Sequence, residues 1–272
     1  EMRNNPLPTA LPSAPLALAR KDVVQGPGPS LYCWALARPA GDEIALVKTQ
    51  LFRGAGVFGC DNYTVFSNAP VALSPGPPVR VSTEVVKGSL SCPTGSSGGA
   101  PLNAEIFVRI WKRVLSDKRF EEYDWTVKVD PDSVFLPHRL RQHLSRYLEL
   151  SYSSPADRVY FRNCKRGLDG AIEVISRGGM WFFGAGFKRC EQGLRGEHRE
   201  SLFLQRCMAV LGVREMEDFG LLTSPDCDPL PAEPMPCTSG KVAFHPLKTT
   251  EAYFTCLSQA EMPLVKPTGM VA

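Results

Sequence analysis

The sequence predicts a single α/β domain of three layers, in which a mostly parallel mixed sheet lies between two layers of helices. Short apolar, β-branched runs that are typical of buried strands alternate with amphipathic helical segments along most of the chain. The first strand, helix and strand fall within about thirty residues, the length of a βαβ unit, and such units build parallel sheets. A chain of 272 residues, 43% of them hydrophobic, is long enough for one large α/β domain or two small ones.

The two ends of the chain lack the pattern of a folded domain. Residues 1–29 hold six prolines and little periodicity, so we expect a tail or stalk there, the folded domain over 30–260, and a second tail over 261–272. The net charge of +3 is too small to indicate nucleic acid or an anionic membrane surface as a partner. No window approaches the ~18 consecutive apolar residues of a membrane span, and we expect any signal or anchor segment to lie outside this sequence.

The strands and helices of the first half follow from apolar runs and from the residues that bound them. Gly54 and Gly56 end the first helix, whose inward face repeats at helical spacing. Asn103 is a good helix cap, and an apolar stripe from Ile106 to Val114 follows it. The elements expected here are a strand at 31–37, a helix from Asp42 to about Arg53, a strand at 57–60 leading into Asp61, a strand at 79–86, and a helix after Asn103.

The second half continues the same alternation. Pro137 suits the first turn of a basic helix, and Thr249 caps the last helix. The aromatic cluster Met180–Phe183 is interpreted mainly as core. The elements expected here are a strand at 125–129, a helix from Pro137 to about Leu150, strands at 159–162 and 172–176, a helix from about Glu200 to Leu211, a strand at 242–244, and a helix that ends near Gln259.

The strand at 125–129 leads into two carboxylates two residues apart, Asp130 and Asp132. In an extended backbone, residues i and i+2 point to the same side, so both carboxylates can converge on one ion. Pro131 fixes its own φ and keeps Asp130 extended. Carboxylate oxygens suit Mg²⁺ or Mn²⁺, ions that bridge protein carboxylates to substrate phosphates. Because ligands of open α/β sheets bind beyond the carboxyl ends of strands, the pair predicts a metal site rather than an Asp-Pro turn with two solvated acids.

Nine cysteines are dispersed along the chain, and none are two or three residues apart. This spacing excludes Cys-x-x-Cys zinc and redox motifs and favours a few disulfides in an oxidising compartment, with buried free thiols as the alternative. Cys227 and Cys237 flank a Pro-rich segment and are one pair that would close it. The odd count leaves at least one thiol unpaired or paired with another chain. Asn62-Tyr63-Thr64 is a glycosylation sequon, which fits a secretory route.

Three blocks of sequence lie in order along the chain: Lys128–Asp132, Glu200–Val213 and Val242–Lys248. They resemble, respectively, the Lys-x-Asp-x-Asp metal motif, the Glu-Asp-Val block with its following Cys and its Leu-Gly-Val ending, and the late His-Pro segment of one family. That family is the GT-A glycosyltransferases of the β1,3-galactosyltransferase and fringe group, and the blocks cover residues 30–260 thinly. The resemblance implies a GT-A-type, Rossmann-like version of the three-layer α/β/α fold.

The resemblance also implies a UDP-sugar donor, a glycan or glycoprotein acceptor, and a divalent ion, usually Mn²⁺ and otherwise Mg²⁺. Departure of UDP develops negative charge, which a preorganised cation beside the diphosphate stabilises. The implied location is the secretory pathway, in the Golgi lumen or outside the cell. Trp181 is the aromatic residue to test for sugar contact. The residues expected at the donor are Asp61, Lys128, Asp130 and Lys248, and those expected on the ion are Asp130, Asp132 and His245.

The expected base is where this chain departs from the family pattern. The family's base is the Asp of the Glu-Asp-Val block, and that position is Ser201 here. An inverting transfer needs a carboxylate to take the acceptor's proton, and serine is a poor base at neutral pH. We therefore place catalysis at Glu200 and Ser201, with Glu197 as another acid and Glu173 ranked below Glu200. Glu200 is equally explained as an ordinary acid in the first turn of a helix.

Two other classes of function stay open. Ser201 motivates a non-catalytic protein of the same fold that binds a nucleotide-sugar or a partner protein. An apolar strand followed by Asp-x-Asp-x-Val also suits an aspartyl-phosphate phosphotransferase with Asp130 as nucleophile. That motif lies mid-chain, however, and no downstream Lys and paired acids complete such a site. An EF-hand loop is excluded by spacing, since its sixth and twelfth positions would be Phe135 and Arg141.

Overall fold

The computed structural model describes residues 28–74, 76, 80–92, 103–151, 153–227 and 235–262. The tails predicted at 1–29 and 261–272 therefore fall almost entirely outside the described residues. The main sheet has seven strands, which from one edge to the other are β3 (Glu84–Val85), β2 (Asn62–Ser67), β1 (Leu31–Leu36), β4 (Trp125–Val129), β7 (Ile172–Ser176), β6 (Val159–Arg162) and β8 (Arg214–Glu217). β7 runs antiparallel to β4 and β6, and the other neighbouring pairs are parallel, which confirms the predicted mostly parallel mixed sheet.

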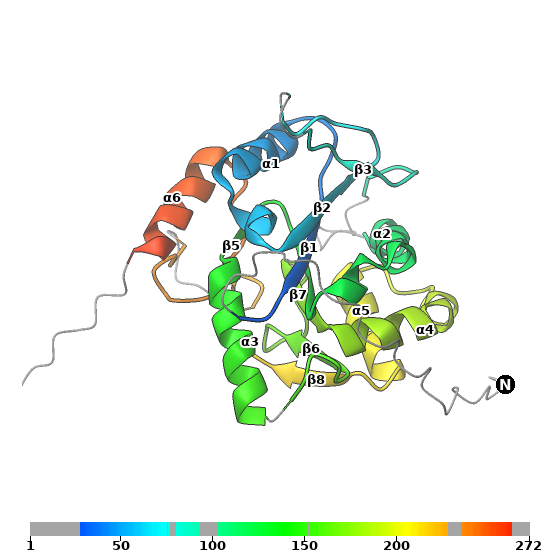
Figure 1. Cartoon of the computed structure of the whole chain (residues 1–272). Helices are drawn as coiled ribbons and strands as arrows, with labels where there is room; N and C mark the ends of the chain where they lie inside the picture. Colours follow the sequence, from blue (N-terminus) through cyan, green and yellow to red (C-terminus); the bar gives the residue numbers. More distant parts are fainter. Residues whose placement is uncertain are drawn as a thin grey trace, which may run out of the picture.

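Helices cover both faces of this sheet. They are α1 (Asp42–Arg53), α2 (Ala104–Asp117), α3 (Pro137–Ser151), α4 (Arg177–Gly193), α5 (Glu200–Val210) and α6 (Thr250–Glu261). Figure 1 shows α1, α3 and α6 on one side and α2, α4 and α5 on the other. Side chains alternate between the two faces, so in β1 Leu31, Cys33 and Ala35 face one core layer and Tyr32 and Trp34 the other. The predicted three-layer α/β/α fold is confirmed.

A second sheet of three short strands lies beside the first. Its strands are β5 (Val134–Phe135), β10 (Ala243–Phe244) and β9 (Leu222–Thr223), with β10 in the middle. β10 is antiparallel to β5 and parallel to β9. Tyr253 and Cys256 of α6 join Val134 and Phe244 in a small separate core. Because β5 begins just after Asp132, this sheet brings β10 and the residues that follow it beside the predicted acid pair.

Two predicted elements are wrong or shorter than expected, and one helix was missed. The apolar run at 57–60 forms a 3₁₀ helix (Gly56–Gly59), because glycines with positive φ at 54 and 56 turn the backbone where it begins. The true second strand, β2, starts at Asn62. Of the strand predicted at 79–86, the structure shows Glu84–Val85, while Val79 lies outside the described residues. The cluster Met180–Phe183 belongs to α4, a helix that the sequence did not predict.

Four disulfides account for eight of the nine cysteines: Cys33–Cys60, Cys164–Cys227, Cys190–Cys207 and Cys237–Cys256. They confirm the prediction of several disulfides. The suggested Cys227–Cys237 bond is wrong, since each of these residues pairs with a distant partner that packing brings to it. Within the described part of the chain, every helix is too short or too polar to cross a bilayer.

Candidate functional site

The candidate site lies at the carboxyl ends of β1 and β4, where the strand order of the sheet reverses. From β1 the chain passes through α1 to β2 on one side, and it returns through α2 on the opposite face to reach β4. Where the connections from two neighbouring strands cross to opposite faces of the sheet, a crevice opens at the carboxyl ends of those strands. In open α/β sheets, ligands bind in that crevice.

Asp130 and Asp132 leave β4 into this crevice, as the sequence predicted, and His245 leaves β10 beside them. The backbone N–H of His245 donates to the carbonyl of Thr223 at 3.0 Å, and that of Leu247 donates to the carbonyl of Asp132 at 2.8 Å. These bonds lay the segment after β10 along the acid pair. One ligand atom from each of Asp130, Asp132 and His245 falls within 4.8 Å of the others. The structure therefore brings together the three side chains expected on the ion.

Hydrogen bonds to the backbone hold the acid pair in this conformation. The carbonyl of Pro131, between the two acids, accepts from the Gln50 side chain at 2.7 Å, and Gln50 is buried on α1. The N–H of Asp130 donates to the carbonyl of Ala171 at 3.1 Å, and that of Ser133 donates to the carbonyl of Asp130 at 2.9 Å. The turn is thus fixed from both sides, which preorganises the two carboxylates.

Asp132 and His245 stabilise each other's charge. His245 Nε2 lies 3.4 Å from Asp132 Oδ1. Burial opposes ionisation of both groups, but the hydrogen bond and opposite charge outweigh it, so the pKa of Asp132 is lowered and that of His245 is raised. His245 Nδ1 is buried and finds no hydrogen-bond partner among the described residues. A histidine with an unsatisfied ring nitrogen and a carboxylate neighbour is typical of a ligand position.

The donor set fits a divalent cation with mixed oxygen and nitrogen ligands. Two carboxylates and one imidazole suit Mn²⁺ better than Mg²⁺, which favours oxygen ligands alone. The side chains of Asp130, Asp132 and His245 are 29%, 23% and 20% exposed, so an ion and its substrate can reach them. Lys248, three residues beyond His245, is exposed, and its charge contributes to the lowered pKa of Asp132.

Lys128 lies beneath this site, inside the sheet, rather than at an open donor surface. Its ammonium is buried and contacts Asp130 at 2.9 Å, Glu200 at 3.4 Å and the carbonyl of Gly170. The ring of Phe107 lies 4.5 Å away. Burial alone would lower the pKa of Lys128, but the surrounding carboxylates outweigh it and raise that pKa. Lys128 therefore stays charged and acts on the candidate ion through Asp130.

Glu200 is sealed in the same buried cluster, which argues against the catalytic role predicted for it. It is 2% exposed, its Oε1 accepts from the Trp111 indole at 3.0 Å, and its Oε2 faces Lys128. Its backbone N–H donates to the Asn103 side chain at 3.0 Å. A general base must reach the hydroxyl proton of the acceptor, and this carboxylate faces the protein interior. Ser201 is half-buried beside Gly170.

Glu173, the lower-ranked alternative, is also enclosed. It pairs with Lys128 across β4 and β7 and is 1% exposed. Burial, and then the charge of Glu200, raise the pKa of Glu173 well above its usual range. The carboxyl group of Glu173 therefore belongs to the interior of the protein, where burial favours its protonated form. Glu197, another candidate acid, is paired with Arg206 at 2.7 Å.

The structure does not bring Asp61 to the candidate site. Its prediction depended on a strand at 57–60 that would end at Asp61, whereas Asp61 precedes β2 and lies at the amino ends of β1 and β2. The carboxylate is buried and accepts from Arg141 and from the N–H of Leu31, at 2.8 and 2.7 Å. Asp61 therefore joins the first strand to α3, at the opposite end of the strands from the candidate site. Trp181 also lies at that opposite end of the strands, against Phe120.

Three residues near the site were missed by sequence reasoning. Arg38 and Glu43 follow β1, and the N–H of Arg38 donates to Glu43 at 2.6 Å. Burial, together with the nearby charges of Asp132 and Asp130, raises the pKa of Glu43. The third, Asp169, precedes β7, and its charge contributes to the raised pKa of His245. The sequence position of each residue was the signal that could have found it. Charged residues that follow β1 or precede the antiparallel β7 must lie at the end of the sheet where β4 ends.

Comparison with known proteins found similarity in structure and none in sequence. No protein-family model matches this chain, and no curated protein is similar to it in sequence. Among solved structures, it is similar to a glycosyltransferase involved in the glycosylation of the major capsid of PBCV-1. The TM-score is 0.49 at 11% identity, over 84% of this chain and 98% of that chain. Because one fold serves many functions, we base the function on the side chains of the site.

Proposed function

We propose that this protein is a divalent-cation-dependent glycosyltransferase that takes a UDP-sugar as donor and a glycan or glycoprotein as acceptor. The observation that carries the proposal is the convergence of Asp130, Asp132 and His245 at the switch point of the sheet. Segments more than a hundred positions apart meet there with a ligand set suited to Mn²⁺ on a diphosphate. The GT-A family resemblance of these motifs supports the same function.

Each residue has a task that its position allows. Asp130, Asp132 and His245 would hold the cation, and Gln50 fixes the turn between the two acids. When bound, the cation neutralises charge on the departing UDP. Lys248 is exposed beside Asp132 and adds a counter-charge for phosphate.

The alternative is a non-catalytic protein that binds a nucleotide-sugar. The observation that favours it is the enclosed carboxylate of Glu200 next to Ser201, which leaves the expected base position without an accessible acid. It predicts saturable binding of UDP with Mn²⁺ and no turnover. The aspartyl-phosphate alternative gains no support, because Asp130 is held by buried Lys128 and shares its site with a histidine.

We also propose a secretory or extracellular location for the protein. Four disulfides form more readily in an oxidising compartment than in the cytosol. The Golgi lumen is the compartment that suits a UDP-sugar enzyme with this chemistry.

The test measures UDP release from a panel of UDP-sugars, with and without Mn²⁺, beside calorimetric titration of UDP. Asp132→Asn and His245→Ala are expected to weaken Mn²⁺-dependent UDP binding by tenfold or more, because each removes one ligand. Glu149→Gln, on the exposed end of α3, is the control and is expected to bind like the wild type. Metal-independent release, or release unchanged in Asp132→Asn, would contradict the proposal. Binding without any turnover would favour the non-catalytic alternative.

A further inference from the structure

We propose that Asp169 is the general base of the transfer, in place of the carboxylate that Ser201 lacks. This inference rests on the proposed function and names the residue that would complete it. Asp169 lies in the loop between β6 and β7, immediately before Gly170. A side chain at Gly170 would contact both Ser201 and Glu200, so this loop covers the expected base position.

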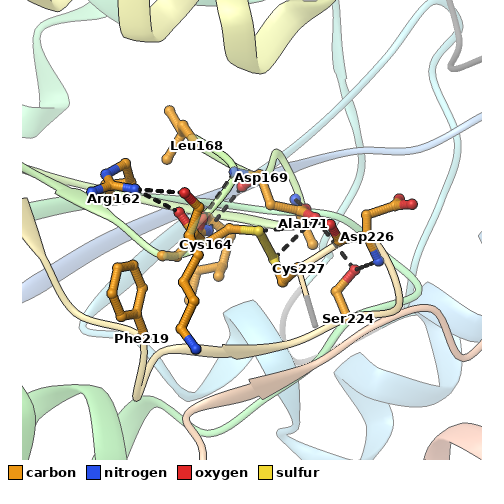
Figure 2. The surroundings of a disulfide bond; sticks show 12 residues. Arg162, Cys164, Leu168, Asp169, Ala171, Phe219, Ser224, Asp226 and Cys227 are labelled. Carbon is orange, nitrogen blue, oxygen red and sulfur yellow. Dashed lines mark hydrogen bonds between the residues drawn. A yellow bond between two sulfur atoms is a disulfide. The ribbon is translucent and has the colours of Figure 1, made fainter. Parts of the chain in front are cut away.

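Asp169 is held rigidly, and Figure 2 shows it beside the disulfide Cys164–Cys227. Its Oδ1 accepts from the N–H of Ala171 at 2.9 Å, and its Oδ2 accepts from the buried hydroxyl of Ser224 at 3.3 Å. The Sγ of Cys227 lies 3.5 Å from the same Oδ2. The disulfide joins the β6–β7 loop to the segment after β9, and both segments border the candidate site. A catalytic group needs this kind of fixed support.

Two short paths connect Asp169 with the ion ligands. Ala171, which donates to Asp169, also accepts the N–H of Asp130 through its carbonyl. Ser224, which also donates to Asp169, follows Thr223, whose carbonyl accepts the N–H of His245. Asp169 therefore lies near the ligand group, on the side of β7 and β9, and its charge contributes to the raised pKa of His245. It shares two neighbours with that group.

The position suits a base better than a further ligand. Among the described residues, Asp130, Asp132 and His245 form one group with ligand atoms within 4.8 Å of one another, and Asp169 belongs to a separate group with Cys164 and Cys227, whose sulfurs are joined in a disulfide. The transferred sugar must fit between the ion-bound diphosphate and the base, so the base has to stand apart from the ligands. Asp169 is half-buried, in contrast to the enclosed Glu200 and Glu173. Among these three acids it is the one that solvent reaches.

The step is a single displacement with inversion. The Asp169 carboxylate takes the proton of an acceptor hydroxyl, and the hydroxyl oxygen forms a bond to the anomeric carbon of the sugar. The bond from that carbon to the diphosphate oxygen breaks, and its electron pair leaves with UDP. The products are the inverted glycoside, UDP and protonated Asp169, which returns its proton to water.

The test compares Asp169→Asn with the wild type, using the UDP-sugar and saccharide acceptor that the wild type turns over. Asparagine keeps an acceptor for the Ala171 N–H, so the fold and the UDP–Mn²⁺ affinity are expected to stay within twofold of wild type. Transfer is expected to fall by about 10²- to 10⁴-fold, the usual contribution of a general base. Azide has no proton to lose, so it is expected to restore UDP release in Asp169→Asn and to give the inverted glycosyl azide. Asp226→Asn, on an exposed acid beyond Ser224, is the matched control and is expected to transfer like the wild type.

The outcomes separate this inference from the function on which it rests. A wild type that releases UDP from no donor overturns both. An active wild type with Asp169→Asn equally active overturns only the assignment of Asp169. So does a loss of rate matched by an equal loss of UDP–Mn²⁺ affinity without azide rescue, because that pattern indicates a structural or binding role. Asp169→Glu keeps the carboxylate and is expected to transfer faster than Asp169→Asn. Equal transfer rates in the two variants would also count against the inference, and so would failure of both variants to fold.

Discussion

Replacing Lys128 with methionine tests the buried charge cluster directly. Methionine matches the length of the side chain, and it leaves Glu200 inside the protein without the ammonium 3.4 Å away. Lys128 and Glu200 are each 2% exposed, so water cannot replace the lost partner. Removing one member of a buried pair costs about 3–5 kcal/mol, because the other charge stays uncompensated. We expect Lys128→Met to lose that amount of unfolding free energy.

Urea denaturation followed by tryptophan fluorescence measures this loss. With a slope of about 3 kcal/mol/M, the midpoint is expected to drop by roughly 1–1.7 M. The double variant Lys128→Met, Glu200→Gln should recover at least half of the loss, because the neutral amide still accepts from Trp111 and no buried charge is left alone. Lys112→Met, on an exposed ion pair of α2, should cost less than about 1 kcal/mol. A Lys128→Met protein within 1 kcal/mol of wild type would refute the reasoning.

Three further predictions concern the interior and the surface of the fold. Because the pKa of Glu173 is raised in the folded protein, its contribution to stability is fully present below the usual pKa of glutamate and is lost as the pH rises. Above pH ~4.5, Glu173→Gln should therefore gain stability over wild type by up to about 1.4 kcal/mol per pH unit. Urea unfolding from pH 4.5 to 8 measures this gain, and a pH-independent difference would contradict the prediction. Removing the Cys33–Cys60 bond with a double alanine variant should cost about 3.5 kcal/mol for a separation of 27 residues, and an unchanged melting temperature would contradict it. The Asn62 amide donates to the hydroxyl of Tyr123 at 2.9 Å, so the sequon should carry no glycan, and a mass shift on deglycosylation of protein from a secretory host would show otherwise.

The acid pair and most of the fold could be predicted from the sequence because the signals are local. An apolar strand followed by Asp-x-Asp fixes both the direction and the spacing of the two carboxylates, and the structure keeps them at the end of β4. The helix after Asn103 was equally clear from its stripe, although the Asn103 side chain accepts from Glu200 instead of capping its own helix. Local patterns predict where an element lies and cannot show which distant group will use a polar atom.

The missed α4 shows how packing overrides local propensity. The sequence predicted no helix over this segment, where glycines at 178, 179, 184 and 186 lower helix propensity. In the structure these glycines allow close approach: a Cβ at Gly178 would meet the carbonyl oxygen of Ala156, and one at Gly186 would meet the side chain of Leu211. The gain from close packing outweighs the propensity cost of about 1 kcal/mol for each glycine.

Edge strand β8 was missed for a related reason. Its sequence, Arg214–Glu217, is charged and shows no apolar alternation. Its partners are polar side chains of β6, where Tyr160 donates to Glu215 and Arg162 pairs with Glu215 and Glu217. A strand that is held by ladder bonds and ion pairs at a sheet edge has no hydrophobic signature to find.

The alternation of β4 connects the buried cluster with the candidate ion, and Glu200→Gln tests that connection. Val127 and Val129 face one core layer, so Lys128 faces the other, where Glu200 shares its charge with Asp130. Without the Glu200 charge, the ammonium of Lys128 neutralises more of the Asp130 charge, and its own charge repels a cation bound to Asp130. We expect Mn²⁺ affinity, titrated calorimetrically with UDP present, to fall several-fold.

Glu197→Gln, on the loop before α5, is the matched control and should leave that affinity unchanged, because Glu197 pairs with Arg206 instead. Full Mn²⁺ affinity in Glu200→Gln, combined with lost transfer, would show that Glu200 reaches the acceptor after all. That outcome would return the base to the residue at which the sequence placed it. Weakened Mn²⁺ binding with transfer preserved at saturating Mn²⁺ would instead leave Glu200 as a support for the ligands, since a support affects occupancy of the ion site and a base affects the chemical step.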